Sequence, residues 1–179
     1  GRYISGISGD YLFHSVPYYS MSEEDLELEE FNKLGEQASQ GCVRLAVSDA
    51  KWVYDNCPTG TNVSIYDDAE NAGPLGKPDA IKITDFTNKW DPTDSNKKCP
   101  YAKATPIISG ANDYTIKSGG EFYALAGVTA VDTCGNDITS NIEVFGNVVT
   151  TRKGKYKVTY SVTDVLKRTS SVTITVTVQ

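Results

Sequence analysis

The chain has 179 residues, of which 39% are apolar, 10% aromatic and 22% charged, an ordinary composition for a folded protein. This length admits one large domain or two small ones. No apolar run approaches the roughly 18–20 residues that a membrane-spanning helix requires. The sequence shows no export signal, so a signal is expected upstream of this chain if the protein acts outside the cell.

The net charge of −6 is distributed unevenly along the chain. Residues 1–70 carry 13 acidic and 4 basic side chains (net −9), whereas residues 71–179 carry 10 acidic and 13 basic ones (net +3). An acidic first half argues against nucleic acid as a partner, because phosphate binding needs clustered lysine and arginine. The asymmetry also favours two separately built units.

The four cysteines indicate neither a metal site nor a cofactor. Cys42, Cys57, Cys99 and Cys134 show no CxxC spacing, and one histidine cannot complete an ordinary zinc site with them. If Cys42 stays reduced, the other three can form at most one disulfide. We expect that pair to be Cys99–Cys134, because both fall near turn-rich sequence in the expected second unit, while Cys57 is expected in a helix core face.

The first residues predict a strand, a turn and a second strand over residues 2–18. Gly9-Asp10 breaks the pattern, and Pro17 ends regular pairing. His14, the only histidine, would then project from the end of the second strand. A half-buried histidine bonded to the backbone is the plain alternative to a functional role.

An acidic segment follows, with six acidic residues between Glu23 and Glu30 and no basic residue until Lys33. Residues 21–34 are helical or loop-like in pattern. The segment is either a solvated face or, lying in sequence between His14 and Cys42, a surface that attracts a cationic amine.

The stretch Ser39-Gln40-Gly41-Cys42-Val43-Arg44 is expected to be a turn at the mouth of a helix over residues 48–56. Pro58-Thr59-Gly60 then marks a turn, and the alternation in residues 61–66 predicts a strand. Residues 69–105 contain frequent glycine and proline and little periodicity. We interpret them as a linker, which makes residues 1–68 the first domain.

From residue 106 onward the pattern is that of short strands at regular spacing, separated by turns such as Gly119-Gly120 and Lys153-Gly154. Apolar side chains alternate strictly over residues 155–162 and 172–178, as in strands buried on one face. This predicts a β-sandwich over residues 106–179. No constellation of titratable groups accompanies it.

His14 is the one histidine that the chain offers as a partner for Cys42 in nucleophilic catalysis. A cysteine nucleophile needs a base, and donors for the oxyanion that develops on the attacked carbonyl. His14 would be the base, oriented by a backbone carbonyl near Ser15. The amides of Gly41 and Cys42 would face the oxyanion. Ser39 and Arg44 would support the loop, Arg44 by bonding nearby carbonyls.

These residues also carry a resemblance. The segment from Leu12 to Val63 resembles the catalytic half of bacterial L,D-transpeptidases, in which a histidine motif precedes a Ser-His-Gly-Cys-(Ile/Val/Leu)-Arg motif, a helix and a Pro-x-Gly-Thr-x-Val strand. Here the corresponding residues are His14-Ser15-Val16-Pro17, the Ser39–Arg44 stretch, Trp52 and Pro58–Val63. Trp90-Asp91-Pro92-Thr93-Asp94 is similar to the tail of clostridial-type members. Residues 156–164 resemble bacterial immunoglobulin-like domains of wall-associated proteins, more weakly.

Two features depart from the family pattern. Gln40 stands where the family usually has a second histidine, which is not the base. The strands that precede the histidine motif in the family, including a Thr-Pro-x-Gly element, are missing. A sheet without them exposes an edge and apolar surface, unless something else completes it.

The resemblance implies a mainly β protein: a partial L,D-transpeptidase sheet with one or two helices, then an Ig-like β-sandwich. It implies a peptidoglycan transpeptidase outside the cell, associated with the wall. Cys42 would attack a donor tetrapeptide stem, release D-Ala and form a thioester, and an acceptor amine would resolve this to a 3→3 cross-link. No cofactor, metal, nucleic acid or membrane span is implied.

Two alternatives remain. A sortase-like transpeptidase also orders its residues as histidine, cysteine and arginine, but Cys42 and Arg44 are too close in sequence for that arrangement. A protein of another class, a non-catalytic wall-binding or adhesive fragment, would use the Ig-like domain. A reactive Cys42 favours the enzyme and an inert, buried thiol favours the binder.

Overall fold

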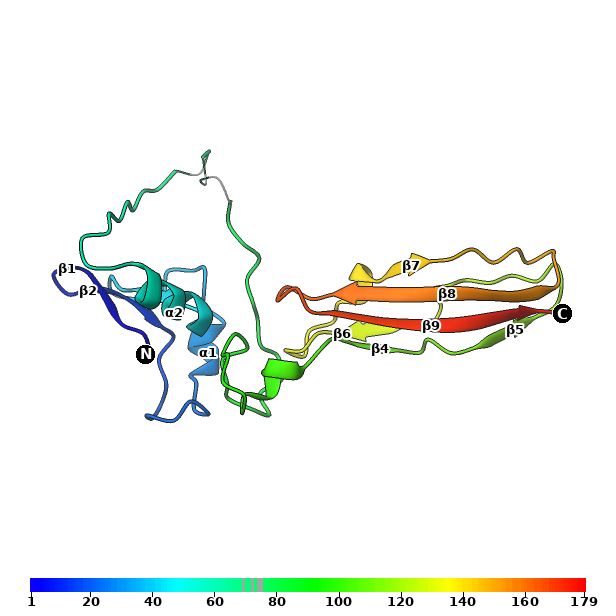
Figure 1. Cartoon of the computed structure of the whole chain (residues 1–179), viewed down its shortest axis with the longest axis horizontal. Coiled ribbons are helices and arrows are strands. Elements are labelled where there is room, and N and C mark those ends of the chain that lie inside the picture. The colour runs from blue at the N-terminus through cyan, green and yellow to red at the C-terminus, as the bar shows by residue number, and fades with distance from the viewer. Residues whose placement is uncertain (69, 72, 74–75) are drawn as a thin grey trace. The chain divides into compact units, whose positions relative to one another are not determined.

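A computed structural model describes residues 1–68, 70–71, 73 and 76–179. The chain divides into two compact units, Gly1–Lys103 and Ala104–Gln179, which Figure 1 shows with their elements labelled. Each unit is described by itself.

A three-stranded sheet is the centre of the first unit. It consists of β1 (Ser5–Ser8), β2 (Tyr11–Ser15) and β3 (Val43–Leu45) in that order. β1 pairs with β2 antiparallel, which confirms the strand, turn and strand predicted there. β2 pairs with β3 in parallel, so residues 30 positions apart in sequence become neighbours.

Two helices accompany this sheet, α1 (Leu28–Phe31) and α2 (Val47–Asn56). The predicted helix over residues 48–56 is thus confirmed, with one additional residue at its start. The placement of Cys42 at the mouth of that helix is wrong, because β3 lies between them. β3 forms there because Val43 and Leu45 pair with β2.

The apolar core of the first unit combines residues from distant parts of the chain. Phe31 and Leu26 are fully buried, and Ile83 is 1% exposed although it lies in the expected linker. The burial of Ile83 requires residues around 83 to belong to the first unit. The members of this cluster are Val16, Leu26, Leu28, Phe31, Ala46 and Ile83.

Residues 81–103 therefore pack onto the first unit, and the boundary between the compact units falls after Lys103. Trp90 and Tyr101 are buried, the latter in a short 3-10 helix, Pro100–Lys103. Cys99 is also buried in this unit. The interpretation of 69–105 as a linker did not include these contacts, because they join residues far apart in sequence.

The predicted strand over residues 61–66 is wrong. These residues lie outside every strand, and Ile65 and Tyr66 are 73% and 61% exposed. Alternation stabilises a strand only where a neighbouring strand pairs with it and a core receives its apolar side chains. Residues 61–66 have neither among the described residues.

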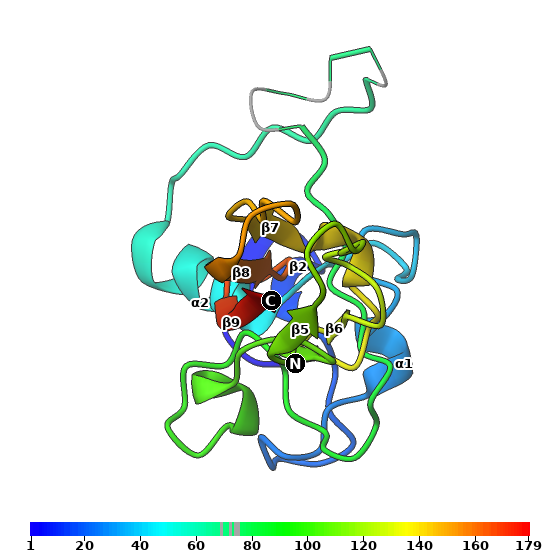
Figure 2. The same cartoon turned by 90° about the vertical axis from the view of Figure 1, so that its right-hand side faces the viewer.

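The second unit is an Ig-like β-sandwich made of two sheets, as predicted. One sheet pairs β4 (Ile107–Ser109) with β6 (Thr129–Val131). The other has the order β5-β9-β8-β7 and contains the two long strands. Figure 2 shows these strands nearly end-on. The bounds of its strands are β5 Tyr114–Ile116, β7 Glu143–Phe145, β8 Gly154–Thr163 and β9 Thr169–Val178, and η2 (Thr139–Asn141) is a 3-10 helix.

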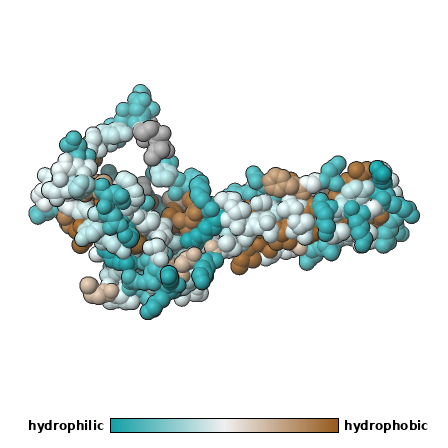
Figure 3. Space-filling view, viewed as in Figure 1, coloured by the Kyte–Doolittle hydropathy of each residue, from teal (hydrophilic) through white to brown (hydrophobic). Residues whose placement is uncertain are grey.

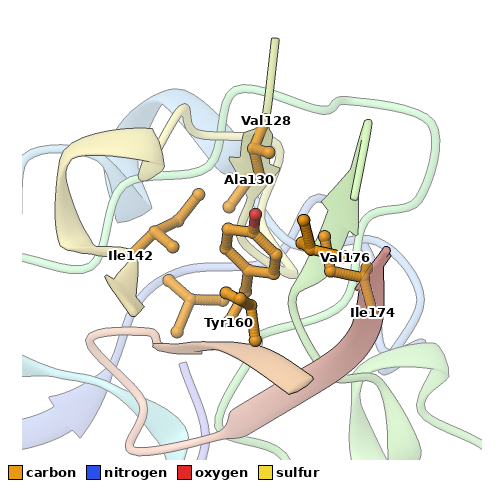
Figure 4. Close-up of a cluster of buried hydrophobic side chains, with 8 residues drawn as sticks. Val128, Ala130, Ile142, Tyr160, Ile174 and Val176 are labelled. Carbon is orange, nitrogen blue, oxygen red and sulfur yellow. The ribbon is translucent and has the colours of Figure 1, made fainter. Parts of the chain in front are cut away.

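Tyr160 is the largest fully buried side chain of this sandwich, and its ring is surrounded by aliphatic side chains that include Val128, Ile142 and Ile174 (Figure 4). Its hydroxyl donates a hydrogen bond of 2.6 Å to the carbonyl of Ala124. The alternation that predicted β8 is directly visible here, because Val158, Tyr160 and Val162 are all buried.

The expected disulfide between Cys99 and Cys134 is wrong. Cys99 belongs to the first unit and Cys134 to the second, and both are buried thiols. Burial, together with the charge of Asp132, raises the pKa of Cys134 to about 12. Cys57, which we expected in the helix core, caps the C-terminal end of α2 and is only partly buried.

Exposed apolar side chains on the second unit form patches separated by hydrophilic surface (Figure 3). They include Ile107, Tyr123 and Phe145. Over the residues that the structure describes, no helix has the length and apolar character needed to cross a lipid bilayer.

Candidate active site

Cys42 and His14 line the same pocket, which has a volume of about 900 Å³. Both side chains are partly exposed, so a substrate can reach them. Arg44 lines this pocket as well. The structure thus brings together the three residues on which the sequence interpretation of the site depends. The other lining residues are Asp10, Tyr11, Gln37, Ala38, Ser39 and Gln40.

The pairing of β2 with β3 explains this convergence. His14 is directly opposite Arg44 in the parallel register, and Cys42 precedes Arg44 by two residues, so that both point to one face. With strands about 4.8 Å apart and a rise of about 3.3 Å per residue, the Cα atoms of His14 and Cys42 lie roughly 8 Å apart. Side chains directed into one pocket can meet across that distance.

The tautomer of His14 follows from its hydrogen bond. Nδ1 lies 2.6 Å from the carbonyl oxygen of Ser15, which can only accept. The neutral ring therefore carries its proton on Nδ1, and Nε2 has the free lone pair that a base needs. The predicted backbone carbonyl near Ser15 is present in the structure.

The loop that leads into Cys42 is fixed by Ser39. The Ser39 hydroxyl donates to the Cys42 carbonyl at 2.6 Å and accepts the amide of Gly41 at 3.1 Å. Gly41 has φ +140°, and a Cβ there would lie 2.3 Å from the ring of Tyr11. A glycine is therefore required for both conformation and space. The Gly41 amide, expected to face the oxyanion, is bonded within the loop instead.

The thiol of Cys42 has a backbone partner that sequence reasoning missed. Its Sγ donates to the carbonyl of Asp10 at 3.8 Å. Asp10 and Tyr11 both line the pocket, at the turn between β1 and β2. The Gly9-Asp10 turn before His14 was visible in the sequence, but nothing local indicated that it lies beside Cys42.

Arg44 forms an ion pair with Glu30 of α1, rather than bonds to nearby carbonyls as we expected. Glu30 also accepts from Lys33 at 2.5 Å. The two cations, Lys33 first, lower the pKa of the Glu30 carboxyl. Arg44 thereby fixes α1 to β3, the strand that follows Cys42. It supports the structure around Cys42, as expected, but through Glu30 and not through backbone carbonyls.

A second pocket of about 440 Å³ also reaches Cys42. It shares Cys42, Arg44 and the residues 37–39 with the first pocket, and extends to Glu30 and Lys33. Cys42 therefore borders both pockets, which adjoin each other along residues 37–39.

The acidic segment between Glu23 and Glu30 is largely engaged in contacts within the fold. Glu23 binds Arg2 at 2.8 Å, Asp25 lies 3.6 Å from Lys89, and Glu30 pairs with Arg44. These pairs reduce the charge that the segment can offer to a cationic amine. Only Glu30 of the six acidic residues lines a pocket that contains Cys42.

Among the described residues, no three histidine, cysteine, aspartate or glutamate side chains are grouped so that they could hold a metal ion. The chemistry that the pocket offers is that of a thiol, an imidazole with a defined tautomer, and loop amides. This is the set needed for nucleophilic acyl transfer.

The two compact units match two different known families. Residues 2–65 match the L,D-transpeptidase catalytic domain, and residues 106–178 match the Ig-like domain of bacterial surface proteins. Both resemblances predicted from the sequence are confirmed. Both matches indicate the bacterial cell envelope.

Among curated proteins, the chain is similar to "Putative L,D-transpeptidase YciB" of Bacillus subtilis (strain 168). The two are 49% identical over 57 residues, which are 32% of this chain and 28% of the relative. The chain thus matches just over a quarter of the length of that relative.

Two solved structures also show similarity. One contains the CBM51-2 domain in complex with GlcNAc and the INT domains of Clostridium perfringens ZmpB, at 31% identity and a TM-score of 0.38 over 41% of this chain and 16% of that one. The other is the lipoprotein BT2262 of Bacteroides thetaiotaomicron, at 22% identity and a TM-score of 0.34 over 41% of this chain and 37% of that one.

Proposed function

We propose that the protein containing this chain is a cysteine L,D-transpeptidase that joins peptidoglycan stem peptides by 3→3 cross-links. The observation that carries the proposal is the placement of His14 and Cys42 in one pocket, with Nδ1 of His14 on the Ser15 carbonyl. This tautomer leaves Nε2 free to take the thiol proton. The family match over residues 2–65 supports the same chemistry.

The first half of the reaction forms an acyl-enzyme. His14 Nε2 accepts the Cys42 proton, and the sulfur attacks the carbonyl that precedes the terminal D-Ala of a donor tetrapeptide. The C–N bond to D-Ala breaks, and its nitrogen leaves with the proton from the His14 imidazolium. The Cys42 amide is the nearest candidate to hold the oxyanion, and the Gly41 amide joins it only if it releases Ser39.

The second half regenerates the thiol. An acceptor amine, typically of a diaminopimelate side chain, attacks the thioester carbonyl and loses its proton to His14. The C–S bond breaks as the new amide forms, and the proton returns to the Cys42 sulfur. The two adjoining pockets that Cys42 borders provide space for the donor and the acceptor. This reaction takes place outside the cell, at the wall, where stem peptides are found.

Acylation of Cys42 by a carbapenem, followed by intact mass, tests the proposal. The wild-type chain should gain one adduct, Cys42→Ser none, and Cys57→Ser one, since Cys57 lies outside both pockets. His14→Gln should slow acylation without changing its stoichiometry. A chain extended upstream should be measured in parallel.

The outcomes separate three cases. Labelling of both chains would identify this chain as a working core, and labelling of only the longer one would assign the activity to the extended protein. If neither folded protein is labelled, the transpeptidase proposal is refuted, and wall binding through the Ig-like domain becomes the better explanation.

A further inference from the structure

We propose that Asp91 and Asp94 are positioning residues for the catalytic pair, an inference that rests on the proposed function. They lie in residues 81–96, beyond residue 65 where the match to the catalytic family ends. Both carboxylates are buried, with exposures of 0% and 5%. Each uses one oxygen to form its own turn and directs the other to a residue far away in sequence, Val47 or Arg2.

Asp94 is connected to His14 through two residues. Its Oδ2 accepts from Nη1 of Arg2 at 2.6 Å. The backbone of Arg2 is paired with Ser15, donating to Oγ at 2.7 Å and accepting the Ser15 amide at 2.9 Å. The Ser15 carbonyl accepts His14 Nδ1. Asp94 thus fixes the residue whose carbonyl selects the His14 tautomer.

The position of Arg2 is defined further by a second carboxylate. Its Nη2 donates to Glu23 at 2.8 Å, and Glu23 in turn accepts from the side chain of Asn96. The second oxygen of Asp94 accepts the Asn96 amide at 2.9 Å. Asp94 is buried and Arg2 partly buried, so removing either charge leaves the other without its partner, and the segment and the end of β2 hold each other in place.

Asp91 acts on the other strand. Its Oδ2 accepts the Val47 amide at 2.9 Å, at the start of α2, and Oδ1 accepts the amide and hydroxyl of Thr93 at 2.8 and 2.6 Å. The hydroxyl oxygen of Thr93 also accepts the Ser48 amide at 3.1 Å. Ala46, the N-cap residue of α2, provides no side-chain bond. Asp91 and Thr93, which lie more than 40 positions further along the chain, therefore cap the start of α2.

The contacts of Asp94 with Arg2 and of Asp91 with Val47 hold the same end of the sheet. β2 and β3 are parallel, so their C-terminal ends lie together, β2 ending at Ser15 and β3 at Leu45, one residue before the α2 cap. His14 is on one strand and Cys42 directly precedes the other. Fixing both strand ends fixes the separation of base and nucleophile. A displacement of about 1 Å can lower a reaction rate about 100-fold, so this separation matters for catalysis.

The test uses the single histidine of the chain, provided that the protein is made without a histidine tag. Its ¹⁵N spectrum, recorded where the imidazole is neutral, reports directly whether Nδ1 or Nε2 carries the proton. The variants are Asp94→Asn and Asp91→Asn. The matched control is Asp79→Asn, the same change at an exposed carboxylate of the neighbouring sequence.

Each variant has a distinct expected result. Asp94→Asn should shift His14 from a pure Nδ1–H tautomer to a mixture. Asp91→Asn should leave the tautomer intact, because it acts on the Cys42 side. Both should lower the maximal rate of carbapenem acylation about tenfold or more, while the carbapenem concentration for half-maximal rate changes less than about threefold. Asp79→Asn should alter neither quantity.

An unchanged tautomer in Asp94→Asn, with an acylation rate within about twofold of wild type in both variants, would overturn the inference. If Asp94→Asn does not fold, Arg2→Lys replaces it, because lysine keeps the charge but cannot bind Asp94 and Glu23 with one planar group. If the wild type is acylated neither as this chain nor with its upstream extension, the proposed function is refuted instead, and the tautomer comparison still decides the positioning role.

Discussion

The bidentate contact of Asn32 with Ile83 gives the sharpest test of whether residues 81–103 are part of the first unit. The Asn32 side chain donates from Nδ2 to the Ile83 carbonyl at 2.8 Å and accepts the Ile83 amide on Oδ1 at 2.7 Å. Asn32→Asp keeps the shape and the acceptor. It replaces the donor by an oxygen that faces the carbonyl of Ile83.

The expected loss can be worked out from these two bonds. Losing the Asn32 donor leaves the buried Ile83 carbonyl unsatisfied, which costs about 1–3 kcal/mol. The free energy of unfolding of the first unit falls by this amount, a large share of the about 5–15 kcal/mol typical of a domain. Ile83, 1% exposed in the apolar core, would lose its backbone anchor.

Tryptophan fluorescence in urea measures this loss selectively, because Trp52 and Trp90 both lie in the first unit and the second has no tryptophan. Asn32→Ala should give a similar loss without adding a charge. Asn62→Asp, the same change at an exposed position, is the control and should leave the midpoint unchanged. A loss below about 1 kcal/mol in both Asn32 variants would refute the reasoning, since a single buried hydrogen bond already contributes that much.

Three further predictions follow from other contacts. Two cations lower the pKa of Glu30, so its ionised form stabilises the native state above the ordinary glutamate pKa of about 4.3, and this contribution is lost as pH falls through the lowered value. Thermal unfolding across pH should show wild type more stable than Glu30→Gln near neutrality, with the difference vanishing in acid; a constant difference would contradict this. Tyr160→Phe should lower the unfolding free energy of the second unit by about 1–2 kcal/mol, seen by circular dichroism, because one buried bond is lost; an unchanged transition would count against it. Alkylation of the native protein should label Cys42 but should not label Cys99 and Cys134 until urea is added. If Cys99 and Cys134 stay unlabelled in urea and react only after a reductant is added, they form a disulfide and the prediction is wrong.

The parts of the fold that the sequence predicted are those that depend on local periodicity. Strict alternation over residues 155–162 places Val158, Tyr160 and Val162 in the sandwich core. The strand that ends near His14 was predicted from a short apolar run. Residues 61–66 show the limit of this reasoning, because they have the same alternation but no partner strand.

The candidate site could be predicted for a different reason. With one histidine in the chain, a cysteine–histidine pair that includes Cys42 can only use His14. The parallel pairing of β2 with β3, which makes them neighbours, had no local signal. The same is true of Asp10, whose carbonyl meets the thiol, and of Glu30, the partner of Arg44.

Residues 81–103 combine both situations, because their local turns were predictable and their distant partners were not. Asparagine and aspartate side chains there repeatedly accept the amide two residues further on, which is the Asx turn that sequence can indicate. In Asp91 and Asp94 that turn occupies Oδ1 and leaves Oδ2 directed away, toward Val47 and Arg2. A run of such turns with buried carboxylates therefore marks a segment with polar contacts elsewhere in the fold, although it does not say where. The five turns are Asp85 to Thr87, Asn88 to Trp90, Asp91 to Thr93, Asp94 to Asn96, and Asn96 to Lys98.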